Sequence, residues 1–247
     1  MLELARLSKA FGGVRAVDEL TLDLPRGAVF GLIGPNGSGK TTIINLISGL
    51  YTPTSGEILF EGGKIGGMPS HRIVRRGIAR TFQNMRLFSE LSVEDNIRVF
   101  QAPHTRKIGD WLGTRQMSGN SPLHEKVEEL LHKLALTKLR REMAGNLSLG
   151  EQKRLEIARA LATEPSLLLL DEPAGGMSFQ EIKALGELLR NLVAQGLTIM
   201  LVEHNMRFVM AIAQRIAVLN FGRLIACGSP QEVRSNRTVI EAYLGNE

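Results

Sequence analysis

The chain has 247 residues, which is the size of one large domain or of one domain with an inserted lobe. It carries 30 Lys and Arg residues against 25 Asp and Glu, and the resulting net charge of +5 suits an anionic partner without identifying it. Hydrophobic residues make up 43% of the sequence and charged residues 22%, which excludes a mainly disordered chain. Its single cysteine, Cys227, excludes internal disulfides and favours a reducing compartment.

The first part of the chain predicts antiparallel strands and then a strand, a Gly-rich loop and a helix. Residues 2–24 alternate apolar and polar side chains around Phe11-Gly12-Gly13, which is typical of paired antiparallel strands. Residues 28–33 form an apolar run typical of a strand buried on both faces. Residues 34–39 are a Gly-rich turn that leads into an apolar-periodic helix. Further strands are expected at 57–60 and 78–82, and short helices at 41–48 and 69–76.

The pattern becomes helical at about residue 84. Ser92 with Asp95 predicts a helix cap, and the stripe Leu123, Val127, Leu130, Leu131 and Leu134 predicts a helix with one buried face. Residues 103–122 are rich in polar residues and glycine and receive no assignment. We therefore place a helical lobe over residues 84–147.

After residue 147 strands and helices alternate. Ser178 with Glu181 forms an S-x-x-E capping box that opens one of the helices. Strands are expected at 167–170, 197–202, 216–219 and 224–226, and helices at 148–163, from 178 to about 195, at 205–213 and in the tail. No apolar stretch approaches the roughly 18 residues that span a bilayer, so any membrane role is expected to come through a partner.

Residues 34–41 fit the phosphate-loop pattern G-x-x-x-x-G-K-[ST], between the predicted strand and the predicted helix. Glycines in such a loop let successive backbone N–H groups point at phosphate oxygens. Lys40 is expected to reach the β and γ phosphates of a nucleotide, Thr41 to offer its hydroxyl to Mg²⁺, and Thr42 to bond the α phosphate. A Gly-rich turn with a chance Lys-Thr is disfavoured by the flanking elements. The full predicted phosphate-binding set is Gly34, Asn36, Gly37, Ser38, Gly39, Lys40, Thr41 and Thr42.

Four leucines precede Asp171 and Glu172, which places both carboxylates at the carboxyl end of a buried strand. Ligands of open α/β sheets bind at this edge. Asp171 is expected to support Mg²⁺ through water, and Glu172 to orient or deprotonate the attacking water. Taken alone, an Asp-Glu pair there is more often a solvated strand end, but together with the phosphate loop it indicates a nucleotide site.

Residues 147–152, Leu-Ser-Leu-Gly-Glu-Gln, resemble the LSGGQ signature of ABC-type ATPases. Ser148 caps the predicted helix with Glu151 three residues later, which alone would be only structural. The sequence departs from the family pattern at Leu149, where a Gly is usual, and at Glu151, where a Gln is usual. The resemblance implies that Ser148, Gly150 and Glu151 contact the nucleotide of a second cassette.

Three further site residues are implied by the resemblance. Phe11 matches an aromatic that stacks on adenine, although it reads equally as a core residue at a strand end. Gln83 matches a glutamine that senses Mg²⁺ and contacts the membrane partner. His204 matches a switch histidine that contacts the γ phosphate, so the implied catalytic group is Glu172, His204 and Gln83. Ser178 stands where the family usually has an Asp that couples the two sites of the dimer.

The resemblance implies an α/β fold, the P-loop NTPase of the ABC type, as a single domain over residues 1–247. Residues 1–83 and 148–247 would form the nucleotide-binding core, with a mixed or parallel core sheet and an N-terminal antiparallel β subdomain. Residues 84–147 would form the inserted helical lobe.

Finer features resemble the ATP-binding subunits of branched-chain amino acid importers. They are residues 80–88, 154–159, 202–206 and 239–245. The implied function is ATP hydrolysis in a head-to-tail dimer, with ATP and Mg²⁺ as cofactors, to drive uptake of branched-chain or related amino acids. An exporter ATPase of the lipopolysaccharide type, or a non-transport ABC ATPase, is the alternative.

The implied partners are integral-membrane permeases, a second cassette of the same or a related chain, and an extracytoplasmic solute-binding protein reached through the permeases. No nucleic-acid partner is expected. The chain would lie on the cytoplasmic face of the cell membrane as a peripheral protein. Leu87, Phe88 and Leu91 are candidates for the permease-docking surface and, equally, for ordinary core of the lobe.

Overall fold

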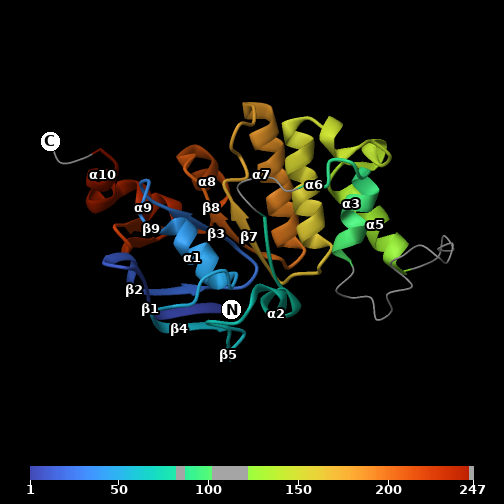
Figure 1. Ribbon diagram of the computed structural model, residues 1–247. Helices are drawn as coiled ribbons and strands as arrows, with labels where there is room; N and C mark the ends of the chain where they lie inside the picture. The colour runs from blue at the N-terminus through green and yellow to red at the C-terminus, as the bar shows by residue number, and fades with distance from the viewer. Residues whose placement is uncertain (82–86, 102–121, 245–247) are drawn as a thin grey trace.

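The computed structural model describes residues 1–81, 87–101 and 122–244 and contains two β-sheets with helices around them (Figure 1). One is a four-stranded antiparallel sheet with the strand order β2-β1-β4-β5. The other is a six-stranded mixed sheet with the order β10-β9-β3-β8-β7-β6. The predicted α/β class, with an antiparallel β subdomain beside a mixed core sheet, is therefore confirmed.

The antiparallel sheet forms where the sequence alternates apolar and polar side chains. β1 (Leu2–Phe11) and β2 (Val14–Leu24) pair across the glycine turn, and β4 (Ser55–Phe60) pairs with the other edge of β1. These strands confirm the prediction for residues 2–24 and 57–60. The two-residue strand β5 (Gly63–Lys64) is too short to show a period and was not predicted.

The mixed sheet is parallel through its centre. β6 (Ile78–Arg80), β7 (Leu167–Asp171), β8 (Thr198–Val202) and β3 (Val29–Ile33) run parallel to one another. Strand β9 (Arg215–Asn220) continues this order, and β10 (Arg223–Gly228) pairs antiparallel with it. Strands β3, β7 and β8 are buried at every position, because helices cover one face and the antiparallel sheet with α1 covers the other.

Alternate side chains of the central strands enter two separate cores. Phe30 and Leu32 belong to the core formed with α1 (Lys40–Ile47) and the antiparallel sheet. Val29 and Ile33 belong to the core formed with the helices of the other face. These helices are α6 (Leu149–Leu161), α7 (Phe179–Ala194) and α8 (Met206–Ile212). Because strand side chains alternate with period two, α1 and α6 lie on opposite faces of this sheet (Figure 1).

A group of helices packs beside the end of α6 and contains the predicted apolar stripe. In it α3 (Val93–Phe100) and α5 (Pro122–Lys133) contact α6, and Ser92 caps α3 by accepting a hydrogen bond from the Asp95 N–H, as predicted. Val127, Leu130, Leu131 and Leu134 are buried. The bounds 84–147 of the lobe stay a prediction, and most of 103–122 lies outside the described residues. The short 3₁₀ turns Thr137–Leu139 and Ala144–Asn146 complete this part of the chain.

The other helices that the structure describes are short. They are α2 (Ser70–Arg75), α9 (Pro230–Ser235) and α10 (Arg237–Leu244). Among the described residues no helix is both long and apolar enough to cross a membrane.

A leucine of the central strand tests how much the fold depends on burial. Leu169 of β7 is fully buried, so Leu169→Ala is expected to lower the free energy of unfolding by about 2–5 kcal/mol, because the cavity it leaves cannot collapse between packed layers. Urea unfolding followed by circular dichroism measures this difference. Val14→Ala is the control, since Val14 is 68% exposed. Equal stability of the two variants would contradict the packing described here.

Candidate active site

The Gly-rich loop runs from the end of β3 to the start of α1. Gly37 and Gly39 have positive φ angles of 77° and 102°, and a Cβ built on Gly39 would collide with the carbonyl oxygen of Ala16. In the described part of the chain no side chain caps α1, and its first turn has no acidic residue. The first N–H groups of α1 are therefore available to an anion at a positive helix end.

Lys40, the first residue of α1, places its ammonium inside this loop. The Nζ atom donates hydrogen bonds to the carbonyl oxygens of Gly34 (2.8 Å) and Pro35 (3.0 Å). Burial lowers the pKa of Lys40, and the nearby carboxylates of Glu172 and Asp171 oppose this shift. The lysine thus lies between the loop and the two acids that the sequence places at the end of β7.

Asp171, the last residue of β7, is 2% exposed and forms an ion pair with Arg80 of β6 at 3.0 Å. The Arg80 guanidinium also donates hydrogen bonds to Asn45 Oδ1 (2.6 Å) and Ser48 Oγ (3.1 Å). Burial raises the pKa of Asp171 above its usual value, and the charge of Arg80 opposes this rise. Arg80 was not among the predicted site residues, because no local pattern links it to an aspartate 91 positions away.

Glu172 and His204 meet at the carboxyl ends of the neighbouring strands β7 and β8. The N–H of Glu172 donates to the carbonyl oxygen of Val202 at 2.9 Å, and Glu172 adopts a positive φ of 51°. Its Oε1 atom lies 3.9 Å from Nδ1 of His204. The imidazole is 63% exposed and the Glu172 side chain is partly exposed, so both face a space open to a ligand.

Glu203, between β8 and His204, is a second residue that sequence reasoning missed. Its carboxylate is 0% exposed and accepts hydrogen bonds from the N–H groups of Ala174 (2.8 Å), His204 (3.1 Å) and Asn205 (3.3 Å). The signal in the sequence was an acid directly after the apolar residues 199–202. That signal does not distinguish a buried acceptor from a solvated strand end.

Phe11 lies at the end of β1 and is 42% exposed. Its ring packs edge-on against Tyr51, with 5.1 Å between the ring centroids, and Lys9 Nζ lies 5.0 Å from its centroid. An exposed ring of this kind offers a face to a planar ligand. Its role as the adenine-stacking residue stays a prediction.

The signature segment starts α6 as a capping box. Ser148 accepts a hydrogen bond from the Glu151 N–H at 3.4 Å, and the Glu151 carboxylate accepts from the Ser148 N–H at 2.8 Å. Glu151 is thus engaged in capping its own helix. Gly150 is buried, and a Cβ on it would collide with the carboxylate of Glu181 at the start of α7. A larger residue at position 150 would therefore have to displace the Glu181 side chain.

The predicted phosphate-loop residues, Asp171, Glu172 and His204 thus come together at one edge of the mixed sheet. Ser148 caps α6 and Gly150 lies in its first turn, and α6 covers the face of the sheet opposite α1. Gln83 lies outside the described residues, so its catalytic and metal-binding roles stay predictions.

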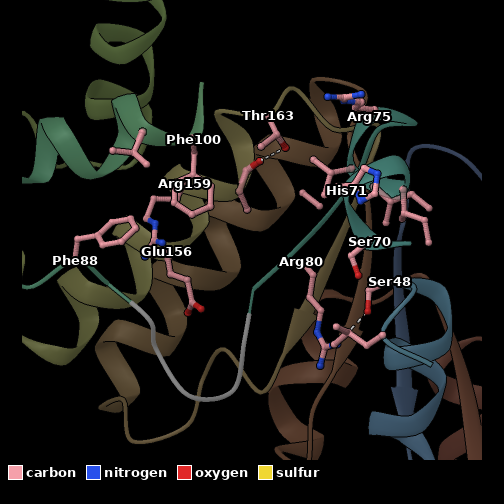
Figure 2. Close-up of a pocket in the computed structure, with 17 residues that line it drawn as sticks. Ser48, Ser70, His71, Arg75, Arg80, Phe88, Phe100, Glu156, Arg159 and Thr163 are labelled. Carbon is pink, nitrogen blue, oxygen red and sulfur yellow. Dashed lines mark hydrogen bonds between the residues drawn. The ribbon is translucent and has the colours of Figure 1, made fainter. Parts of the chain in front are cut away.

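A groove of about 790 Å³ separates α2 and β6 from α3 and α6 (Figure 2). We call it the interlobe groove. One wall carries Phe88, Phe100 and Arg159, with the Arg159 guanidinium 4.1 Å from the Phe100 ring centroid and 5.2 Å from that of Phe88. The facing wall carries Ser70 of α2 and Arg80, the partner of Asp171. The groove therefore adjoins Asp171 at Arg80.

The three candidate docking residues differ in position. Phe88 lines the interlobe groove and is 45% exposed, whereas Leu87 packs against the core. Leu91 is half-buried and does not line the groove.

Comparison with known protein families gives two matches. Residues 17–175 match the family described as ABC transporter, and residues 223–247 match the one described as branched-chain amino acid ATP-binding cassette transporter.

Three relatives cover nearly the whole chain. The high-affinity branched-chain amino acid transport ATP-binding protein BraF of Pseudomonas aeruginosa is 40% identical over an alignment of 256 positions. The alignment covers 99% of this chain and 98% of BraF. LivG of Escherichia coli K12, described in the same words, is 40% identical over 250 residues, with the same coverage. The lipopolysaccharide export system ATP-binding protein LptB of Escherichia coli K12 is 34% identical over 241 residues, covering 98% of this chain and 95% of LptB.

Solved structures give the same result. A nucleotide-free ATP-binding cassette from an ABC transporter is 30% identical, with a TM-score of 0.86 and coverage of 100% of this chain and 99% of the other. A dimeric cassette in a post-hydrolysis state, bound to ADP and Pi, is 26% identical, with a TM-score of 0.79 and coverage of 93% and 99%. With its phosphate loop, its acidic strand end and these full-length similarities, this chain belongs to the ABC transporter family, as an ATP-binding cassette.

Proposed function

We propose that this chain is the ATP-hydrolysing subunit of an importer for branched-chain or related amino acids. The observation that carries the proposal is the convergence of Lys40, Glu172 and His204 at one sheet edge, in a chain 40% identical to BraF along its length. The cassette acts at the cytoplasmic face of the membrane, bound to permease subunits that carry the solute. A solute-binding protein delivers the solute to these permeases from the other side.

The loop and the start of α1 suit the phosphates of ATP. Ser38 Oγ is buried and has no hydrogen-bond partner among the described residues, so it is an orphaned polar atom that a phosphate oxygen would satisfy. Lys40 exchanges its bonds to the loop carbonyls for bonds to the β and γ phosphates. Thr42 bonds the α phosphate, and the exposed ring of Phe11 stacks on the adenine.

Mg²⁺ fits the same edge as the companion of ATP. The described residues contain no cluster of three or more His, Cys, Asp or Glu that would hold a metal by itself. This donor set suits Mg²⁺, which binds through one or two protein oxygens together with substrate phosphates and water. Thr41 supplies a hydroxyl, Asp171 a carboxylate that acts through water, and Gln83 an amide. When bound, the ion neutralises charge on the phosphates.

Glu172 and His204 then do the protein's part of the hydrolysis. Glu172 orients the attacking water or takes its proton, and His204 contacts the γ phosphate and holds the geometry of the attack. Their side-chain atoms Glu172 Oε1 and His204 Nδ1 lie 3.9 Å apart, which supports a joint action on one ligand. Positioning and charge stabilisation supply most of the rate enhancement in phosphoryl transfer.

A second cassette completes each site. The position of α1 and α6 on opposite faces of one sheet supports a role of Ser148 and Gly150 toward the phosphate loop of a neighbouring copy. ATP between the two chains is bound by both, and loss of the γ phosphate removes shared contacts. Closure and opening of the dimer thus follow the nucleotide state.

The interlobe groove is the site where the permease docks. Its walls are largely apolar with exposed aromatic surface at Phe88, which suits an amphipathic segment of the permease. The C-terminal match to branched-chain amino acid cassettes, together with 40% identity to BraF against 34% to LptB, favours amino-acid uptake over lipopolysaccharide export.

Glu172→Gln tests the assigned general base. The amide cannot accept the proton of water, so the rate of ATP hydrolysis is expected to fall by about 10²–10⁴-fold while ATP binding is kept. Phosphate release measures the rate, and gel filtration with ATP is expected to reveal a trapped dimer. Hydrolysis at the wild-type rate would remove Glu172 from this role.

Lys40→Ala tests the phosphate contacts instead. Loss of the charge-assisted bonds to two phosphates is expected to raise the Kd of ATP by about ten- to a hundredfold. Isothermal titration with a non-hydrolysable ATP analogue measures this directly. An unchanged Kd would place the phosphates elsewhere.

A pull-down from native membranes tests the transporter assignment. Tagged Glu172→Gln protein with ATP, extracted in mild detergent, is expected to bring down two multi-spanning permeases identified by mass spectrometry. Adding Phe88→Ser is expected to reduce their recovery severalfold, while the same substitution in the wild-type chain leaves ATP hydrolysis by the isolated cassette unchanged.

Recovery of only soluble or nucleic-acid partners would overturn the transporter assignment.

The solute class is tested separately, by uptake of labelled leucine, isoleucine and valine in cells whose own copy carries Glu172→Gln. Undiminished uptake of all three would contradict the proposed cargo.

A further inference from the structure

Glu203 is a buried acid that the mechanism above does not use. Its side chain is 0% exposed, yet the described residues place no Lys or Arg within ion-pair distance of it. The imidazole of His204 lies close by, with Nδ1 3.9 Å from Glu203 Oε2. A buried carboxylate without a cation is costly unless hydrogen bonds stabilise its charge.

Three backbone N–H groups supply these bonds, and they come from two different loops. Oε1 accepts from Ala174, in the loop that follows β7 and Glu172. Oε2 accepts from His204 and Asn205, in the loop that follows β8. A carboxylate has only acceptors, so it can serve donors on both sides at once.

The two loops are already adjacent at their start. Asp171 and Val202 are partners in the β7–β8 register, and the Glu172 N–H donates to the carbonyl oxygen of Val202. Beyond this point the strands end and their ladder of hydrogen bonds stops. The Glu203 carboxylate extends the connection by bonding Ala174, two residues after Glu172, to the backbone of His204.

We propose that Glu203 is a positioning residue that holds the general base Glu172 and the switch residue His204 in one fixed relation. This inference rests on the ATPase function proposed above. The backbone on either side of Glu172 is held by Val202 on one side and by Glu203 through Ala174 on the other. The backbone N–H of His204 is held by the same carboxylate, so a shift of either loop strains the other.

The Glu203 carboxylate also connects the loop of His204 with the loop that leads to α7. The loop from Ala174 continues to Ser178, which caps α7, and Glu181 of that helix packs against Gly150 of the signature segment. A movement of His204 on the γ phosphate is passed through Glu203 to this loop, within one chain.

The substitution Glu203→Gln tests the proposal in the full-length chain. The amide has the size of the carboxylate, but only one of its two ends is an oxygen that can accept a hydrogen bond. Its NH₂ end would meet a backbone N–H group, and two donors cannot bond each other. We expect kcat for ATP hydrolysis to fall by about tenfold or more, because a buried N–H loses its acceptor next to the reacting groups. The KM and the Kd for ATP are expected to stay within about twofold of wild type, because Lys40 and its loop are untouched.

Hydrogen exchange followed by mass spectrometry locates the effect. Peptides over residues 173–178 and 203–206 are expected to exchange faster in Glu203→Gln than in wild type. Glu232→Gln is the matched control, since Glu232 also accepts a backbone N–H, from Ser229 at 2.7 Å, and belongs to the capping box of α9. This control is expected to leave kcat unchanged.

Glu203→Asp provides a second variant in case Glu203→Gln does not fold. It keeps the charge on a side chain one methylene shorter, and its kcat is expected to lie between those of wild type and Glu203→Gln, at an unchanged KM. A kcat equal to wild type in whichever of the two variants folds, or a rise in KM without a fall in kcat, would overturn the positioning role. A wild-type chain without ATPase activity would instead refute the proposed function.

Discussion

The site depends on the parallel pairing of β3, β8 and β7 in one register. Leu32 and Asp171 both pair with Val202, so these three strands end at the same level. The residues that follow them are the phosphate loop, Glu172, and the pair Glu203 and His204. Chain segments far apart in the sequence are thereby brought to one edge, where the positive end of α1 also points. Full burial of these strands on both faces makes the register hard to change, because a slip would move apolar side chains to the wrong core.

Charge burial makes this edge rigid as well as polar. Lys40, Asp171 and Glu203 are all nearly or fully buried; Lys40 is bonded to its own loop, and Asp171 and Glu203 to distant segments of the chain. A charged group in such a setting has few alternative positions. If it left its partners, it would stay buried without the hydrogen bonds that offset its loss of water. Phosphoryl transfer benefits from this rigidity, because it requires groups already aimed at developing charge. Glu172 and His204, by contrast, are partly exposed at the same edge.

The edge is also connected to the rest of the molecule on two sides. Toward the interlobe groove the connection is Arg80, which lines the groove and bonds Asp171. Toward α7 and the signature segment it runs through the loop from Ala174 to Ser178. A cassette that couples hydrolysis to a membrane partner needs both connections. One leads toward the membrane partner and the other toward the second cassette.

Local patterns in the sequence determined much of the fold and part of the site. The phosphate loop, the capping boxes at Ser148 and Ser178, and the apolar strands before Gly34 and Asp171 were all predicted, because their hydrogen bonds or periods lie within a few residues. Arg80 and Glu203 were not predicted as parts of the site. Arg80 meets Asp171 across 91 positions and Glu203 meets Ala174 across 29. Such contacts follow from strand order and register, which no local pattern encodes, so only the tertiary structure decided which buried charges hold the predicted residues in place.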